Sequence, residues 1–205
     1  MDALVLVDIQ NDFMPFGALP VVEGDAVVPV ANRLMSRFEV VVATQDWHPA
    51  DHGSFAVNHP AAMPGDVVEL GGVPQVLWPE HCVTGTPGAS FHSALDIGPV
   101  RHVVRKGSDP GVDSYSGFFD NDHRSATGLE SLLRGLGVAR VVLLGLATDY
   151  CVKYTALDGA ALGFEVVVVS DGCRAVDLAR GDGERALAEM AASGARIVTS
   201  GEVAR

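Results

Sequence analysis

Apolar residues gather in short runs along the chain, and six of these runs have the length and composition of β-strands. Several of them are apolar almost throughout, which is typical of strands that are covered on both faces. A buried sheet is therefore expected at the centre of the molecule. The predicted strands cover residues 3–7, 39–43, 100–105, 140–146, 165–169 and 195–199.

Between the strands, apolar residues recur with helical spacing. Apolar positions between residues 27 and 34, and leucines between residues 129 and 136, repeat in the i, i+3, i+4, i+7 order of amphipathic helices. A third helix is predicted over residues 183–193. Thr148 is a suitable N-cap for a fourth, running through Cys151 to about residue 162. This alternation of strands and helices predicts an α/β fold with a parallel sheet.

The chain has the size and composition of one compact domain. Its 205 residues, 48% of them hydrophobic, are enough to bury one substantial core, so we predict a single domain over residues 1–205. The one long irregular region, residues 46–99, is rich in proline, glycine and histidine. Because such stretches in compact domains are more often functional than idle, we expect it to contribute to the substrate site.

Composition narrows the partners. A net charge of −12 opposes binding to nucleic acid, which requires clustered lysine and arginine. No apolar stretch approaches the roughly 20 residues that span a bilayer, so no membrane partner is expected. The odd set of three cysteines, Cys82, Cys151 and Cys173, without a signal segment favours the reducing cytoplasm. The oligomeric state stays open, a homo-oligomer included.

Polar residues stand at the ends of four predicted strands. Asp8, Asp46, Lys106 and Cys151 each come at or shortly after the end of an apolar run. In open parallel sheets, ligands bind beyond the carboxyl ends of the strands, where the strand order reverses, so these four residues can converge on one pocket. Asp8 could then accept the thiol proton of Cys151, with Lys106 stabilising both anions. The alternative is a structural ion pair between Asp8 and Lys106.

Cys151 follows a turn where a strand is expected to pass into a helix. The free amides and positive dipole end of a helix N-terminus stabilise a thiolate, so this position predicts a lowered pKa and a nucleophilic thiol. The alternative is an ordinary buried cysteine, since free cysteines are among the most buried residues. The polar residues around Cys151 favour the nucleophile.

A second group of residues has the character of a metal site. In an extended segment Asp46 and His48 point to the same side, and His81 from the following loop could complete the site. One carboxylate and two imidazoles suit a divalent transition metal, either zinc, iron or manganese. His52 is either a fourth ligand or a loop histidine bonded to backbone. Without wider context, the Asp-x-His motif would more often mark a surface loop.

These segments together resemble the nicotinamidases within the isochorismatase-like cysteine hydrolases. The matching motifs follow one another in order through nearly the whole chain, which makes the set far more specific than any member. They are Val-Asp-Ile-Gln-Asn-Asp-Phe at 7–13, Asp-Trp-His-Pro at 46–49, Trp-Pro-Glu-His-Cys-Val at 78–83, Lys-Gly at 106–107, Tyr-Ser-Gly-Phe at 115–118 and Gly-Leu-Ala-Thr-Asp-Tyr-Cys-Val at 145–152.

The resemblance implies a three-layer sandwich with a six-stranded parallel sheet between helices. It implies a Cys151 nucleophile served by Asp8 and Lys106, and a metal held by Asp46, His48 and His81. It also implies a cis peptide before Ala147 and an oxyanion hole formed by the amides of Ala147 and Cys151. Four further residues would line an aromatic-sized pocket, although ordinary core packing is the alternative for each. They are Phe13, Leu19, Trp78 and Tyr115.

The activity that the resemblance implies is hydrolysis of nicotinamide to nicotinate and ammonia through a Cys151 thioester, in NAD salvage, with pyrazinamide as a further substrate. A relative acting on a carbamoyl or ureido amide would keep Cys151, Asp8 and Lys106 but would not need the metal residues. A metal-binding module without activity is the other alternative. The complete set of catalytic residues argues against that module.

Overall fold

The computed structural model describes residues 1–203, and its centre is a six-stranded sheet. Every neighbouring pair of strands in the sheet is parallel, and all six predicted strands are present, which confirms the predicted sheet. The strand order is β5-β2-β1-β6-β7-β8. The strands are β1 (Asp2–Val7), β2 (Val40–Asp46), β5 (His102–Lys106), β6 (Arg140–Leu146), β7 (Glu165–Arg174) and β8 (Arg196–Val198).

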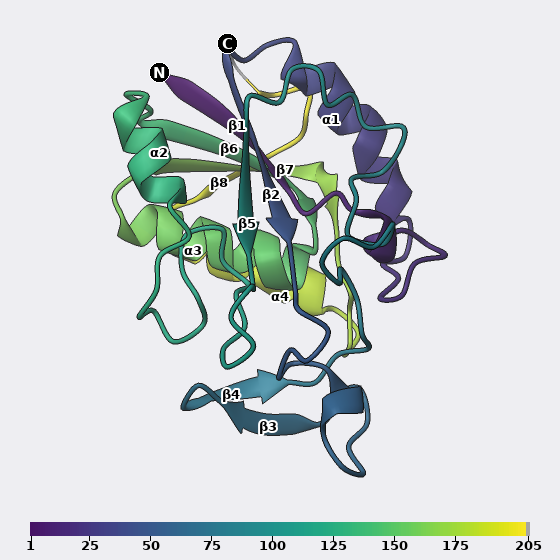
Figure 1. The fold of residues 1–205 in the computed structure, drawn as a ribbon. Helices are drawn as coiled ribbons and strands as arrows, with labels where there is room; N and C mark the ends of the chain where they lie inside the picture. Colours follow the sequence, from purple (N-terminus) through teal and green to yellow (C-terminus); the bar gives the residue numbers. More distant parts are fainter. Residues whose placement is uncertain (204–205) are drawn as a thin grey trace.

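Helices cover both faces of this sheet (Figure 1). Helix α1 lies on one side, and α2, α3 and α4 lie on the other, so the molecule is the predicted three-layer α/β sandwich. Among residues 1–203, no helix is long and apolar enough to cross a membrane. The helices are α1 (Val27–Met35), α2 (Leu129–Gly135), α3 (Lys153–Ala161) and α4 (Asp182–Ala192), with single 3-10 turns at Asn11–Phe13, Gly24–Ala26 and Ala56–Asn58.

The apolar runs form strands because the helices bury them on both sides. Three consecutive strands, β1, β6 and β7, show this burial. At most 1% of the surface is exposed in Leu4, Val142 and Val168, one residue from each strand. Apolar residues that fill both faces stabilise the sheet by about 25 cal/mol for each Å² removed from water. The predicted apolar stripe of α1 lies against this core, with Val27 and Leu34 buried.

Two strands extend further than their apolar runs predict. Strand β2 continues through Thr44 and Gln45 to Asp46, and β7 continues to Arg174. In β2 the added residues are polar yet buried, because each finds a partner: Thr44 bonds Asp8, and Gln45 bonds the Ala89 carbonyl. Hydropathy alone ends a strand where the polar residues begin, although hydrogen bonds allow the strand to go on.

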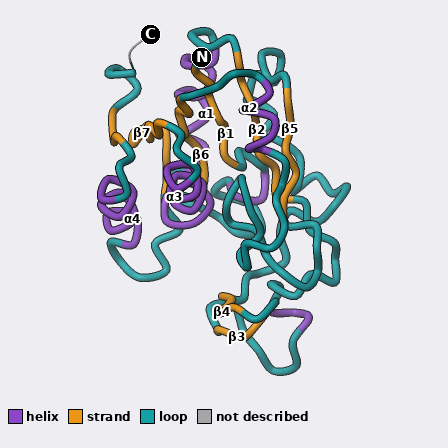
Figure 2. Tube along the Cα trace, turned by 90° about the vertical axis from the view of Figure 1, so that its left-hand side faces the viewer, coloured by secondary structure: helices purple, strands orange, loops and turns teal. Residues whose placement is uncertain are grey.

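A small hairpin interrupts the region that was expected to be irregular. Strands β3 (Val67–Leu70) and β4 (Val73–Val76) pair in antiparallel fashion and project beyond the end of the main sheet (Figures 1 and 2). The turn is Gly71-Gly72, and both residues have positive φ, at 62° and 85°. A two-residue turn of this kind favours glycine at both positions, so the glycine pair was the sequence signal for this hairpin.

The segment around Cys151 differs from the predicted helix start. Ala147, not Thr148, is the N-cap, and no side chain caps this end. Residues Thr148–Val152 form one wide π-helical turn, and the α-helix α3 begins only at Lys153. Single π turns inside or beside α-helices are frequent at functional sites. Cys151 therefore lies within a widened turn and not in the first turn of a regular helix.

Candidate active site

The strand order brings the four polar strand-end residues to one edge of the sheet. Lys106 ends β5, Asp46 ends β2, Asp8 follows β1, and Cys151 lies in the turn after β6. These four strands are consecutive neighbours in the sheet. The chain builds outward from β1 to β2 and β5, and then returns to place β6 on the other side of β1. Asp8 and Cys151 therefore flank the point where the strand order reverses, as the sequence predicted.

Lys106 is the centre of this cluster. Its Nζ lies 2.9 Å from Asp8 Oδ2, 3.4 Å from Cys151 Sγ and 2.8 Å from the Ser114 carbonyl oxygen, and it also pairs with Asp46 Oδ1. The side chain is completely buried. Burial alone would lower the pKa of Lys106, but Asp46 and Asp8 raise it well above its usual value. The ammonium is therefore a permanent positive charge beside the thiol.

Asp8 has the geometry of a proton acceptor. Thr44 Oγ1 donates a hydrogen bond of 2.7 Å to Asp8 Oδ1, whereas Oδ2 faces Lys106 without an aligned hydrogen bond. Burial raises the pKa of Asp8, although Lys106 opposes the shift. Asp8 also has a φ of 48°, which is uncommon for a non-glycine residue and costs free energy. Such positions cluster at functional sites, because the surrounding structure must hold them.

The pKa of Cys151 differs from the sequence prediction. Burial raises the pKa of this thiol well above its usual value; Lys106 lowers it, while Asp8 and Asp46 raise it. The prediction of a thiolate stabilised by a helix N-terminus is wrong in direction, because the thiol is buried and two carboxylates face the sulfur. A neutral thiol beside Asp8 requires proton transfer for attack.

Alkylation tests this ionisation. Because the thiol is buried and its pKa is raised, iodoacetamide should react slowly with Cys151 at neutral pH and faster as the pH rises. Lys106→Ala removes the cation that lowers this pKa, so the reaction should become slower still at each pH. Cys82 and Cys173 are buried, do not line the pocket and should stay unlabelled. Equal labelling of all three cysteines by mass spectrometry would contradict the assignment.

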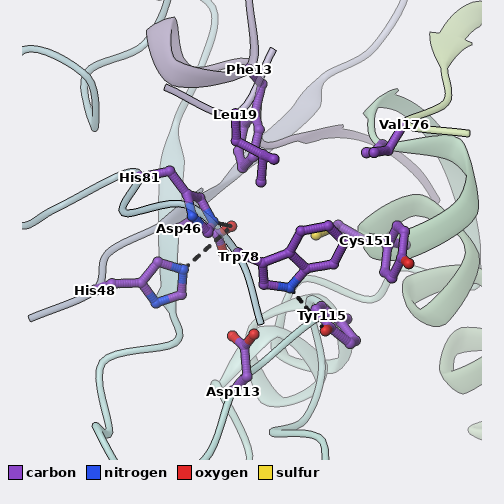
Figure 3. A pocket seen from close by; sticks show the side chains of 12 residues that line it. Phe13, Leu19, Asp46, His48, Trp78, His81, Asp113, Tyr115, Cys151 and Val176 are labelled. Carbon is purple, nitrogen blue, oxygen red and sulfur yellow. Dashed lines mark hydrogen bonds and ion pairs between the residues drawn. The ribbon is translucent and has the colours of Figure 1, made fainter. Parts of the chain in front are cut away.

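Asp46, His48 and His81 form a compact buried group, and its two histidines lie across the pocket from the thiol (Figure 3). Asp46 Oδ2 lies 3.7 Å from His48 Nε2 and 4.0 Å from His81 Nε2. The other ring nitrogen of each histidine bonds a backbone carbonyl: His48 Nδ1 lies 2.7 Å from Gly107 O, and His81 Nδ1 lies 2.8 Å from Pro79 O. These bonds place the proton on Nδ1 and direct the Nε2 lone pairs toward Asp46, as metal-binding histidines require.

The pKa shifts of Asp46 and His81 also suit the binding of a metal cation. Although burial alone would raise it, the pKa of Asp46 is held well below its usual value by Lys106 and His48. Burial and neighbouring His48 lower the pKa of His81 to about 4. Burial lowers the pKa of His48, but Asp46 outweighs it and raises the pKa above its usual value. An ionised carboxylate next to a neutral imidazole is a ligand set that a divalent metal fits.

His52 belongs to a different cluster from Asp46 and His81. It groups with His48 and Asp113, and its ring centroid lies 4.4 Å from that of His48. His52 Nδ1 lies 2.7 Å from the Ser54 hydroxyl and accepts from the backbone N–H of Ser54 over 3.2 Å. With Nδ1 accepting, the proton of the neutral ring is on Nε2. Nε2 is then a buried donor without a protein acceptor. His52 thus presents a proton, not a lone pair.

Two residues that the sequence analysis did not single out hold Asp46 and His48 in place. Gln10 bonds both backbone groups of Asp46, with its Nε2 donating to Asp46 O and its Oε1 accepting from Asp46 N, each over 2.8 Å. Gly107 has a φ of 65° and packs on the imidazole of His48. A Cβ at this glycine would lie 2.4 Å from His48 Cε1, so any other residue here would displace the imidazole ring.

A pocket with about 360 Å³ of empty space, part of it open to solvent, connects Asp46, His48 and His81 with the thiol. His48 and His81 lie at one end, and Cys151 and Val176 lie at the other (Figure 3). All four residues expected to line it do so, and Trp78 Nε1 donates to the Tyr115 hydroxyl over 3.0 Å. Asp113, Tyr150 and Val176 also line it and were missed. The lining residues are Phe13, Leu19, Asp46, His48, Trp78, His81, Asp113, Tyr115, Ala147, Tyr150, Cys151 and Val176.

The backbone before the nucleophile turn has the expected form. The peptide bond between Leu146 and Ala147 is cis, as the resemblance implied. The carbonyl oxygen of Ala147 accepts from the amides of Tyr150 and Val152. Ala147 lines the pocket, and its own amide donates to no protein acceptor among residues 1–203. This amide is therefore free to receive a hydrogen-bond acceptor from the pocket.

A parallel α/β sheet with a thiol, a carboxylate and an ammonium gathered at its switch point is the architecture of an enzyme that acts on a small molecule. A sequence profile described as the isochorismatase domain matches residues 2–202. The chain belongs to the isochorismatase family.

Individual relatives agree over nearly the full length. The nicotinamidase of Escherichia coli (strain K12) is 50% identical over 201 residues, covering 96% of this chain and 94% of the relative. A nicotinamidase and pyrazinamidase structure from Acinetobacter baumannii has a TM-score of 0.96 at 44% identity and covers 99% of this chain and 98% of its own. A pyrazinamidase of Pyrococcus horikoshii, solved in complex with zinc, has a TM-score of 0.79 at 40% identity and covers 97% and 98%.

Proposed function

We propose that this protein hydrolyses nicotinamide to nicotinate and ammonia, in NAD salvage, and that it also accepts pyrazinamide. The observation that carries the proposal is the pocket that joins a thiol beside Asp8 and Lys106 to a metal-binding group. The nicotinamidase relative at 50% identity and the structural neighbours that act as nicotinamidase and pyrazinamidase support the substrate. The three unpaired cysteines support a reducing, cytoplasmic setting.

The reaction begins with the Cys151 thiol facing the amide carbon of the substrate. Asp8 takes the thiol proton as sulfur attacks, and Lys106 stabilises the charge on both groups. The amides of Ala147 and Cys151 donate to the oxygen that becomes negative. Asp8 then gives its proton to the departing ammonia. A water molecule that Asp8 deprotonates hydrolyses the thioester, which releases nicotinate and restores the thiol.

Asp46, His48 and His81 would hold a divalent transition metal, either zinc, iron or manganese. Bound there, the ion would anchor and polarise the ring of the substrate through its pyridine nitrogen, directly or through water. The fit rests on the three ligand atoms, which converge within 4.8 Å of one another, and on the two Nδ1 atoms bonded to backbone carbonyls. The thiol already supplies the nucleophile, so the chain does not need a metal hydroxide.

His52 should contribute little to metal affinity, because Ser54 fixes the tautomer in which Nε2 carries a proton. His52→Gln keeps a donor at this position and should retain about one zinc per chain, with an affinity within about threefold of wild type. Equilibrium dialysis against zinc measures this directly. A drop in affinity as large as that of His81→Gln would make His52 a ligand after all.

Ammonia release measured in a coupled assay tests the function. Purified protein loaded with zinc should release ammonia from nicotinamide and pyrazinamide, whereas benzamide, which lacks the ring nitrogen, should be poor. A buried polar group that is left without its hydrogen-bond partner costs about 1 to 3 kcal/mol, so the expected difference is about 5- to 150-fold. No ammonia from nicotinamide, together with release from a carbamoyl or ureido compound, would support the metal-independent amidase alternative. No turnover of any of them would support an inactive metal-binding module.

A further inference from the structure

The carboxylate of Asp149 joins two walls of the pocket. Asp149 belongs to the same wide turn as Cys151, two residues before it. Its Oδ1 accepts from the backbone amide of Val176 over 2.9 Å, and its Oδ2 accepts from the amide of Asp177 over 2.8 Å. Asp149 is buried, with 4% of its surface exposed, and does not itself line the pocket. Val176 does line it, at the same end as Cys151 (Figure 3).

The segment after β7 is also hydrogen-bonded to α4. Asp177 follows Val176 with a φ of 53°, and its Oδ1 accepts from the amide of Gly183 over 2.8 Å, at the start of α4. The segment after β7 is thus held at one end by Asp149 and at the other by the first turn of a helix. Among residues 1–203, the amides of Val176 and Asp177 donate to no acceptor other than Asp149, so this carboxylate alone ties them to the turn Thr148–Val152 that carries Cys151.

Two acceptors are essential to this contact. A carboxylate offers an oxygen to each of two successive amides, whereas an asparagine offers one oxygen and one NH₂ group. Asparagine has the same shape, but its NH₂ would face an N–H donor and leave that buried amide without a partner. The chemistry of the contact, and not merely its size, therefore requires aspartate.

We propose that Asp149 is a positioning residue that sets the place of Val176 against the substrate at the thiol end of the pocket, and so determines the Michaelis constant for ring amides. Asp149 touches neither the substrate nor the reacting atoms, and it acts through Val176. The inference rests on the proposed function, because nicotinamide turnover is its main readout. A wild-type protein without turnover would refute that function, whereas the positioning role depends only on differences between variants.

Asp149→Asn tests the proposal by its effect on KM and kcat separately. We expect KM for nicotinamide to rise about tenfold, as for the loss of one buried hydrogen bond, and kcat to change by no more than about threefold. Asp171→Asn is the matched control, because Asp171 also accepts two bonds, from the amide and the hydroxyl of Ser200, but lies outside the pocket. Its KM should equal that of wild type.

A double-mutant cycle with Val176→Ala completes the test. Val176→Ala alone should raise KM several-fold. In the double variant with Asp149→Asn, the rise in KM should be much smaller than the product of the two single rises, because both residues act on one wall. Independent, multiplying effects would overturn the proposal, as would a KM for Asp149→Asn equal to that of Asp171→Asn. If Asp149→Asn does not fold, an unchanged KM in Val176→Ala is sufficient to overturn it.

Discussion

Replacing Cys151 by alanine is expected to abolish nicotinamide hydrolysis and to leave the fold intact. Among residues 1–203, Cys151 is the only sulfur-containing residue that lines the pocket, so the substitution removes the atom that forms the thioester. The loss in kcat should be about 10⁴-fold or more, as for the removal of a covalent nucleophile. Ammonia release measures the activity, and circular dichroism measures the fold.

The other two cysteines provide the controls. Cys82 and Cys173 are buried and do not line the pocket, so Cys82→Ala and Cys173→Ala should retain most of the activity. A Cys151→Ala variant that still turned over at about a tenth of the wild-type rate would rule out covalent catalysis at this residue. Water would then have to be the direct nucleophile.

Removal of a metal ligand is the second change with a large expected effect. His81→Gln should lower the affinity for zinc by about 100-fold or more, since even the loss of an outer partner of a ligand costs about 10- to 100-fold. Hydrolysis of nicotinamide should fall with the zinc affinity, toward the low rate expected for benzamide. Hydrolysis of benzamide, which has no ring nitrogen to anchor, should fall much less in this variant.

His123→Gln is the control for this experiment. His123 is exposed, pairs with Asp158 and lies outside the pocket, so its replacement should change neither zinc binding nor turnover. Full activity with unchanged KM in metal-stripped wild-type protein would refute the metal role of Asp46, His48 and His81. The metal-independent amide hydrolases would then be the better guide to the mechanism.

The sequence predicted the sheet because its strands are apolar on both faces, and that pattern survives without knowledge of the tertiary structure. It placed Asp8, Asp46, Lys106 and Cys151 together because parallel strands share one carboxyl edge. It failed where partners decide the outcome. Thr44 and Gln45 remain in β2 through hydrogen bonds to distant groups, which hydropathy along the chain does not report.

The same reason explains the residues that were missed. Gln10 and Asp149 act through backbone atoms of segments far away in sequence, so their roles depend on the folded neighbours. The pKa of Cys151 was predicted in the wrong direction, because the prediction weighed a helix end and had no measure of burial or of the two carboxylates. The sequence pattern can place a reactive residue, but its desolvation and the charges around it are known only from the folded structure.

Asp46 serves both halves of the site with one carboxyl group. Its Oδ1 pairs with Lys106, and its Oδ2 faces the two histidines. A descendant that replaced Asp46 to dispense with the metal would also deprive the lysine of one of its two counter-charges, and would leave a buried ammonium with Asp8 alone. The anchoring of substrate and the charge beside the nucleophile therefore evolve together: a metal-free descendant has to supply a new anion for Lys106 at the same time.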